Sequence, residues 1–258
     1  MSEKNREGKR SARERLAVER EKRRAADKRR RALIVGASIV CVLGLATVVG
    51  VLAANAGKSG KSGASGPATA PSGATGKDGL AIPVGKDSAK STLTVWEDFR
   101  CPACEAFETA YRPAVRQLAD AGQLKVEYHL VTLIDGNLRG SGSLRAANAA
   151  ACAQDAGKFW DYHDVLYQNQ PKETQDTFGD NDKLIELAGK VDGLTTPTFE
   201  KCVKDGTHDS WVQKSNTAFQ AGGFSGTPTV LLDGKNVYGD QTMTPAKLKQ
   251  MVEAANKS

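Results

Sequence analysis

Apolar positions after about residue 80 alternate in some segments and recur at helical spacing in others. An alternating run at 92–96 predicts a β-strand, and helical periodicity follows from near Pro102 to about Gly122. A second alternating run at 124–131 predicts another strand. The first half of this domain is therefore expected to be β-α-β.

The second half begins with a long helical block and ends with a hairpin and a helix. Residues 142–220 have helical periodicity interrupted by glycines and prolines. Two β-like runs, 229–232 and 236–238, flank Asp233-Gly234, a strong β-hairpin signal. The pattern over 243–255 predicts a closing amphipathic helix. The complete predicted order is β-α-β, a helical block, then β-β-α.

Residues 32–54 are 23 consecutive uncharged residues, and four basic residues precede them at 28–31. A helix of that length reaches about 34 Å, enough to cross a bilayer. Because positive flanks stay cytoplasmic, the sequence predicts a single-pass cell-membrane protein with its N-terminus inside and its catalytic domain extracytoplasmic. The alternative is a cleaved signal peptide, for which Ala54-Asn55-Ala56 offers a site, but the apolar run exceeds a usual signal-peptide core.

Charge and composition divide the rest of the chain. Residues 1–31 form a basic cytoplasmic tail with 14 Lys/Arg against 6 Asp/Glu, whereas the remainder is slightly acidic despite the overall +6. The basic excess is thus terminal, which argues against a nucleic-acid-binding domain. Residues 55–79 have the Gly/Ser/Ala/Pro composition of a flexible linker, and 80–257 contain one domain's length of sequence.

Cys101-Pro102-Ala103-Cys104 lies between the first predicted strand and the helix after it. Pro102 suits the first helical position, which places Cys101 at the helix N-terminus, where free N–H groups favour a thiolate. Cys104, one turn further on, is expected to be less exposed and protonated. One low-pKa sulfur with a partner one turn away is the arrangement needed for thiol–disulfide exchange. A structural disulfide and half of a zinc site are the competing interpretations.

The histidines and large aromatic residues do not point to a metal site. Zinc bound at the Cys pair would need two more ligands, but His129, His163 and His208 are scattered along the chain. His163 lies in an aromatic helical cluster and is predicted to pack. Trp211 and Phe219 are eight residues apart, which is typical of a core face. We therefore expect no metal and no cofactor.

Gly226-Thr227-Pro228-Thr229 precedes the strand of the hairpin. A proline there can mark the strand's first residue. Alternatively, a cis Thr227–Pro228 bond packs against the Cys pair and leaves the backbone of Thr227 free to bind an extended substrate.

Three cysteines lie outside the Cys-x-x-Cys motif. Cys152 and Cys202 flank most of the helical block, and on the oxidising side of a membrane they are predicted to form a structural disulfide; two buried free thiols are the alternative. Closing that loop contributes roughly 4 kcal/mol in the chain-entropy model. Cys41 lies within the predicted membrane span and is interpreted as an apolar filler.

Three motifs in order resemble DsbA-like thiol:disulfide oxidoreductases of the thioredoxin superfamily. They are 96–104 around the Cys pair, 157–163 in the helical block (Gly-Lys-Phe-Trp-Asp-Tyr-His), and 226–229. The resemblance covers about 80–257. Membrane-anchored actinobacterial members with a CPAC motif are the most similar type.

The resemblance implies a fold, a substrate-binding loop and a partner. The fold is a thioredoxin-like α/β core with a helical domain inserted at about 138–222. Thr227–Pro228 is the implied cis-proline loop. The implied re-oxidant is a quinone-linked membrane protein of the DsbB or VKOR type.

Two positions differ from many relatives. A glutamate six residues before the first cysteine serves proton transfer in those relatives, but here that residue is Val95. Glu97 and Asp98 are nearby, although strand alternation predicts that their side chains point elsewhere or to opposite faces. The strongest oxidants carry His before the second cysteine, where this chain has Ala103. We therefore expect a milder oxidant.

The predicted function is oxidation of exported proteins that carry free thiols, through Cys101 and Cys104. One alternative keeps this site and reverses electron flow, as a reductase or isomerase. Another is a tethered, non-enzymatic binding module in which the Cys pair is a structural disulfide.

Overall fold

A computed structural model describes residues 68–240 and 242–257. The predicted basic tail 1–31, the membrane segment 32–54 with Cys41, and the linker residues 55–67 lie outside the described residues. Among the helices of the described part, none has the length and apolar character needed to cross a membrane.

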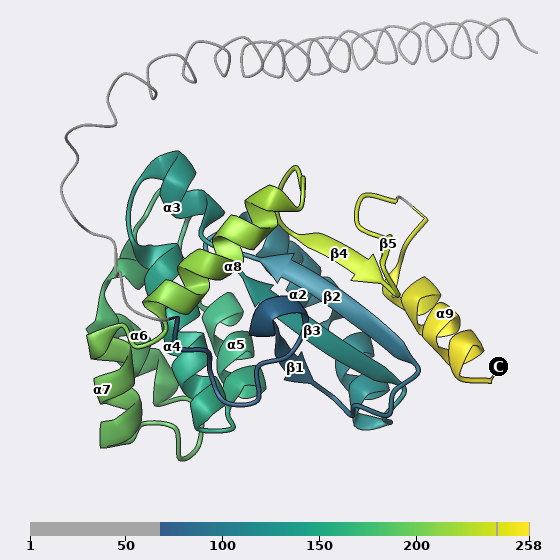
Figure 1. The fold of residues 1–258 in the computed structure, drawn as a ribbon, viewed down its shortest axis with the longest axis horizontal. Helices are drawn as coiled ribbons and strands as arrows, with labels where there is room; N and C mark the ends of the chain where they lie inside the picture. The colour runs from purple at the N-terminus through teal and green to yellow at the C-terminus, as the bar shows by residue number, and fades with distance from the viewer. Residues whose placement is uncertain (1–67, 241, 258) are drawn as a thin grey trace, which may run out of the picture. The chain divides into compact units, whose positions relative to one another are not determined.

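Five strands form one mixed sheet in the order β1-β3-β2-β4-β5 (Figure 1). The central strands β2 (Ser91–Glu97) and β3 (Leu124–Leu130) are parallel, joined by the helix α2 (Pro102–Asp120). The other neighbouring strand pairs in this sheet are antiparallel. The predicted β-α-β start is therefore present. Burial alternates over the first four residues of both β2 and β3, as the sequence pattern predicts, whereas the last three residues of each strand are all buried.

The hairpin consists of β4 (Thr229–Leu232) and β5 (Lys235–Asn236), followed by α9 (Pro245–Lys257). Its turn residues Asp233 and Gly234 have φ values of 49° and 80°. Positive φ at both central positions is the requirement that makes Asp-Gly a favoured hairpin turn. The predicted hairpin is confirmed, with a second strand shorter than expected.

The helical insertion lies between β3 and β4, as the sequence predicts. Its elements are α3 (Leu133–Leu138), α4 (Gly142–Asp155), α5 (Phe159–Gln168), η2 (Thr177–Gly179), α6 (Asn181–Ala188), α7 (Pro197–Asp205) and α8 (Asp209–Ala221). The first of these helices begins at Leu133, five residues before the expected boundary. Helix α4 is central, and its buried alanines allow close packing of the neighbouring helices.

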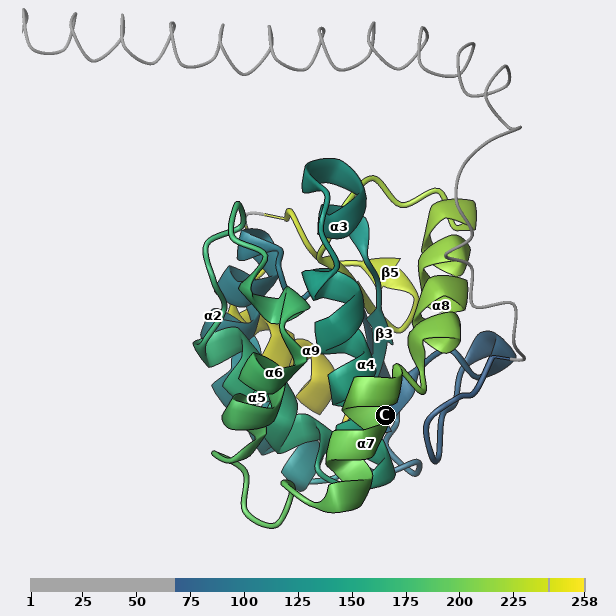
Figure 2. The same ribbon diagram turned by 90° about the vertical axis from the view of Figure 1, so that its left-hand side faces the viewer.

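Helices cover both faces of the sheet. In Figure 2, α8 lies on one side of β3, whereas α2, α5 and α9 lie on the other. Helix α2 packs on α5 of the insertion and on the C-terminal helix α9, and thus joins the insertion to the rest of the domain. Helix α2 begins close to the C-terminal end of β2 and contacts α5, so the sheet and the insertion meet at this end of β2.

Residues 68–79 correct the predicted extent of the linker. Ser72 N donates to Asp155 Oδ1 at 2.7 Å, Trp211 Nε1 donates to Gly79 O at 2.7 Å, and Lys77–Gly79 form a short 3-10 helix, η1. The segment has few apolar side chains, but side chains of the domain bind its backbone groups. The segment then leads into β1 (Ile82–Val84), a three-residue strand too short for the sequence pattern to predict.

Candidate active site

Cys101 is the N-cap residue of α2, and Pro102 occupies the first turn. The carbonyl of Cys101 accepts the first helical hydrogen bonds, from Cys104 N at 3.0 Å and Glu105 N at 3.2 Å. Cys101 is 7% exposed and Cys104 is 0% exposed. Both are free thiols, so the geometry is that of the reduced form. The structure places the two sulfurs as the sequence predicts, with the first at the helix terminus and the second beneath it.

The two thiols have opposite pKa shifts. A hydrogen bond from Cys104 lowers the pKa of Cys101 to about 6; burial opposes this shift, while the Thr227 side chain and the backbone N–H groups of Cys104 and Ala103 assist it. Burial raises the pKa of Cys104 well above its ordinary range, and the charges of Cys101 and Glu97 add to this increase. Near neutral pH the pair therefore holds one thiolate and one thiol, the combination that thiol–disulfide exchange requires.

The loop before β4 contacts Cys101 directly. The Thr227–Pro228 bond is cis, and Cys101 Sγ donates to Thr227 O at 3.3 Å. Pairing of Thr229 with Trp96 aligns β4 beside β2 and fixes this loop next to the start of α2. Of the two sequence interpretations, the structure has the cis bond packed against the Cys pair.

A cluster of buried charged groups lies behind Cys104. Glu97 Oε1 is 2.8 Å from His163 Nε2, and the ligating atoms of Glu97, Glu108 and His163 lie within 4.8 Å of one another. Burial raises the pKa of Glu108 to about 8. Burial opposes a charge on His163, but Glu97 and its other acidic neighbours raise the His163 pKa to about 10. The cluster thus contains a carboxyl group that titrates near physiological pH.

The side chain of Glu97 points towards the site, which corrects the expectation that it points away. Val95 and Glu97 are two residues apart, so strand alternation places them on the same face of β2, and both are buried. His163 packs among aromatic rings, including Phe99, Tyr128 and Tyr167, as predicted, and it also pairs with Glu97. The sequence does contain a signal for the role of Glu97: it lies two residues after Val95, so the two side chains share one face of the strand.

A groove of about 330 Å³ opens beside the other side of α2. Its walls come from α2, β4, the loop after β5, and α9; they include Phe107, Tyr111, Tyr238, Met243 and Leu248. Phe107 is one turn after Cys104 on α2. Burial raises the pKa of the Tyr238 hydroxyl, and negative charge on the Cys pair adds to this increase. Tyr238 is 41% exposed although it is large and apolar in part. No local sequence pattern indicates this groove, because its walls come from segments far apart in the chain.

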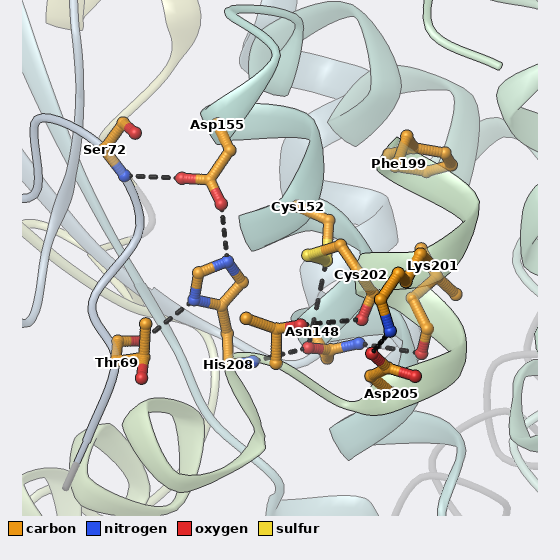
Figure 3. The surroundings of a disulfide bond; sticks show 12 residues. Thr69, Ser72, Asn148, Cys152, Asp155, Phe199, Lys201, Cys202, Asp205 and His208 are labelled. Atoms are coloured by element: carbon orange, nitrogen blue, oxygen red, sulfur yellow. Dashed lines mark hydrogen bonds and ion pairs between the residues drawn. A yellow bond between two sulfur atoms is a disulfide. The ribbon is translucent and has the colours of Figure 1, made fainter. Parts of the chain in front are cut away.

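Figure 3 shows the second cysteine pair, Cys152 on α4 and Cys202 on α7, joined in a disulfide. Next to it, His208 contacts Asp155 through Nε2 and the carbonyl of Thr69 through Nδ1, each at 2.8 Å. The disulfide therefore lies at the place where the segment before β1 attaches to the insertion.

Two groups in the described residues have metal-ligating atoms close together. One is Glu97, Glu108 and His163, and the other is Cys152, Cys202 and His208. In the first group, Glu97 and His163 already pair with each other. In the second group, the sulfurs are bonded to one another, so they are not thiolate ligands while the disulfide is intact.

Comparison with known proteins places the chain in a family. A sequence model described as thioredoxin matches residues 77–254. "Disulfide bond formation protein D" of Bacillus subtilis is 27% identical over 155 residues, which cover 59% of this chain and 67% of that protein.

Two solved structures from Mycobacterium tuberculosis have a similar fold. Oxidised DsbA aligns with a TM-score of 0.59 and 29% identity, over 69% of this chain and 93% of that chain. Reduced DsbG aligns with a TM-score of 0.60 and 29% identity, over 72% of this chain and 90% of that chain.

The sheet order, the helical insertion and a Cys-x-x-Cys pair at the start of a helix define a thioredoxin-fold redox protein with an inserted helical domain. The chain belongs to the thioredoxin family. Within this family it is a DsbA-like thiol:disulfide oxidoreductase.

Proposed function

We propose that the chain introduces disulfides into exported proteins, with Cys101 and Cys104 as its redox pair. The observation that carries this proposal is the contrast between the two sulfurs. Cys101 has a pKa lowered to about 6 at the helix N-terminus, whereas burial raises the pKa of Cys104. A low-pKa thiolate is a good leaving group, so the contrast favours transfer of the disulfide to a substrate.

The exchange takes two steps. A substrate thiolate attacks Cys101 Sγ of the disulfide form, which makes a mixed disulfide and breaks the Cys101–Cys104 bond, with the electron pair leaving on Cys104. A second substrate thiolate attacks its partner sulfur in the mixed disulfide, and Cys101 leaves as a thiolate. Two electrons pass from the substrate dithiol to the protein, and the substrate gains one disulfide.

Cys104 needs a proton when it leaves, because its burial disfavours the thiolate. We assign this proton to the buried cluster of Glu97, Glu108 and His163. The charge of Glu97 acts on Cys104, and Glu108, with its pKa raised to about 8 by burial, holds a proton near neutral pH. The cluster thus supplies the proton that, in many relatives, a glutamate at the position of Val95 transfers.

We assign substrate contacts to Thr227 and Pro228 and to the neighbouring groove. The carbonyl of Thr227 lies 3.3 Å from Cys101 Sγ, so a chain bound along this loop is adjacent to the reacting sulfur. The groove supplies aromatic and aliphatic surface for the side chains of an unfolded substrate.

The proposed location is extracytoplasmic, with residues 32–54 as the membrane anchor, 1–31 as the cytoplasmic tail and 55–67 as the tether. The sequence supports this arrangement through the uncharged run and its basic flank. A membrane partner of the DsbB or VKOR type would re-oxidise the dithiol by accepting its two electrons.

A trapping experiment and a redox titration test the proposal together. In Cys104→Ala, the Cys101 thiolate attacks a disulfide of an exported protein, which forms a mixed disulfide and releases one thiolate of that protein. The variant lacks the thiol that would attack Cys101 and break this bond, so we expect covalent complexes with exported proteins, released by reductant. Since Ala103 replaces the histidine of the strongest oxidants, we expect a reduction potential between those of thioredoxin and DsbA, about −270 and −120 mV.

The alternatives give different results in the same experiments. A potential near the thioredoxin value and a resting dithiol in cells would indicate a reductase or isomerase. The absence of any mixed disulfide from Cys104→Ala would indicate a binding module with a structural disulfide.

A further inference from the structure

The helical insertion reaches back to the backbone on which Cys101 is held. Gln170, two residues after α5, has one side-chain nitrogen with two N–H donors. Nε2 donates to Phe99 O at 2.9 Å and to Cys101 O at 3.1 Å. A single amide therefore joins two carbonyl groups on either side of Arg100.

These two carbonyl groups determine the direction of the chain as it enters α2. The Cys101 carbonyl also accepts from Cys104 N and Glu105 N, the first bonds of the helix. The N–H groups of Ala103 and Cys104 in that same turn stabilise the Cys101 thiolate. Rotation of the 99–101 backbone would move Sγ away from those donors, so the contact from Gln170 acts on the thiolate through the backbone.

Arg100 fixes the distance between the insertion and this loop. It is 1% exposed, and its Nη1 lies 2.6 Å from Asp135 Oδ1 and 2.9 Å from Asp176 Oδ1. Asp135 accepts from Ser143 N and Leu144 N at the start of α4. A buried guanidinium with two carboxylate partners is costly to separate, so the insertion and the loop move as one unit.

Glycines permit this close approach. A Cβ added at Gly142 would lie 2.6 Å from Asp176 Oδ1 and 3.0 Å from Arg100 Cδ. At Gly140, where φ is 125°, a Cβ would lie 2.8 Å from Arg100 Nη1. The loop before α4 and the first residue of α4 thus pack closely around the Arg100 ion pairs.

We propose that Gln170 is a positioning residue for the redox reaction: by holding the carbonyls of Phe99 and Cys101, the helical insertion sets the orientation of the Cys101 thiolate on α2. This inference rests on the proposed function of Cys101. It assigns the insertion a role in tuning the redox pair, in addition to its place in the fold.

The test replaces the amide without changing the size of the side chain much. Gln170→Met removes both donors, and Asn169→Leu is the matched control, because Asn169 Nδ2 donates to Val165 O at the end of α5 and not to the Cys101 loop. The pKa of Cys101 is measured from thiolate absorbance at 240 nm against pH, and the dithiol–disulfide equilibrium is measured against glutathione.

We expect Gln170→Met to raise the pKa of Cys101 by about 1 pH unit, the effect of one lost hydrogen bond. The thiolate of the reduced form is then less stable, so at pH 7 the equilibrium shifts roughly fivefold towards the disulfide. Asn169→Leu should leave both quantities at their wild-type values. Gln170→Asn, which keeps the amide on a side chain one methylene shorter, should behave like Gln170→Met and replaces it if that variant does not fold.

The inference is overturned if both Gln170 variants keep the wild-type pKa and glutathione equilibrium and differ only in thermal stability. That result would make Gln170 a structural contact alone. A wild-type Cys101 that titrates near 8.5, the value of an ordinary cysteine, would instead contradict the proposed function, so the two failures are distinguishable.

Discussion

Glu97 contacts His163 across the interface between β2 and α5, with Oε1 2.8 Å from Nε2, and both side chains are 0% exposed. This pair lies between the sheet and the insertion, behind the buried thiol of Cys104. The negative charge of Glu97 is one of the causes that raise the Cys104 pKa. The insertion therefore contributes a charged partner to the chemistry of the thioredoxin-like core.

Glu97→Gln is expected to lower the pKa of Cys104, because it removes a nearby negative charge. The measurement is the pH dependence of Cys104 alkylation in a Cys101→Ala background, where Cys104 is the remaining thiol of the pair. Glu127→Gln, a carboxyl group on β3 that pairs with Lys125, is the control and should leave this pKa unchanged.

The same Glu97→Gln substitution has two opposing effects on the rate. A lower Cys104 pKa makes a better leaving group and speeds substrate oxidation, whereas loss of an ionisable group from the cluster slows delivery of the proton. We expect the second effect to be larger, with oxidation of a peptide dithiol at pH 7 falling by about 10²-fold. A rate equal to or above wild type would show that Glu97 has no part in delivering the proton to Cys104.

The reduced form should gain stability relative to the oxidised form as pH rises. The pKa of Cys101 is lowered in the folded dithiol, so its thiolate contributes stability that is present above the unfolded pKa and is lost as pH falls through about 6. Melting temperatures of the two forms at pH 5 and pH 8 measure this effect. The melting temperature of the reduced form minus that of the oxidised form should be larger at pH 8 than at pH 5. Cys101→Ala, which cannot form the disulfide, should lack the stability that the reduced wild type gains over the same pH range. A wild-type difference independent of pH would contradict the lowered pKa.

The groove beside α2 predicts a specific effect on substrate affinity. Tyr238→Ser removes an exposed ring from the groove wall, so KM for apolar peptide dithiols should rise several-fold while kcat changes little. Leu138→Ser is a matched control, because Leu138 on α3 is 46% exposed and does not line the groove. Equal KM values for wild type and Tyr238→Ser would place substrate binding elsewhere.

Much of the fold and the Cys pair follows from local sequence signals. Three such signals act over a few residues and appear in the structure: Pro102 after Cys101, the Asp233-Gly234 turn, and the alternation in the first four residues of β2. The contacts that the sequence does not reveal join distant residues. Gln170 and the Cys101 loop, Glu97 and His163, and Ser72 and Asp155 are paired only by the packing of the insertion.

The disulfide between α4 and α7 leads to the last prediction, which concerns stability without redox activity. Cys152 and Cys202 are 50 residues apart, so their bond restricts a long loop of the unfolded chain. In the chain-entropy model, its removal by the double variant Cys152→Ala/Cys202→Ala lowers the free energy of unfolding by about 4 kcal/mol. Urea denaturation of the oxidised protein measures this difference.

The Cys101 pKa should remain about 6 in this double variant, because the Cys152–Cys202 disulfide is not among the groups that determine it. Alkylation without reductant provides the second check: labelling of Cys152 or Cys202 in the folded protein would contradict the disulfide, and a stability loss below about 1 kcal/mol would contradict its role in the fold.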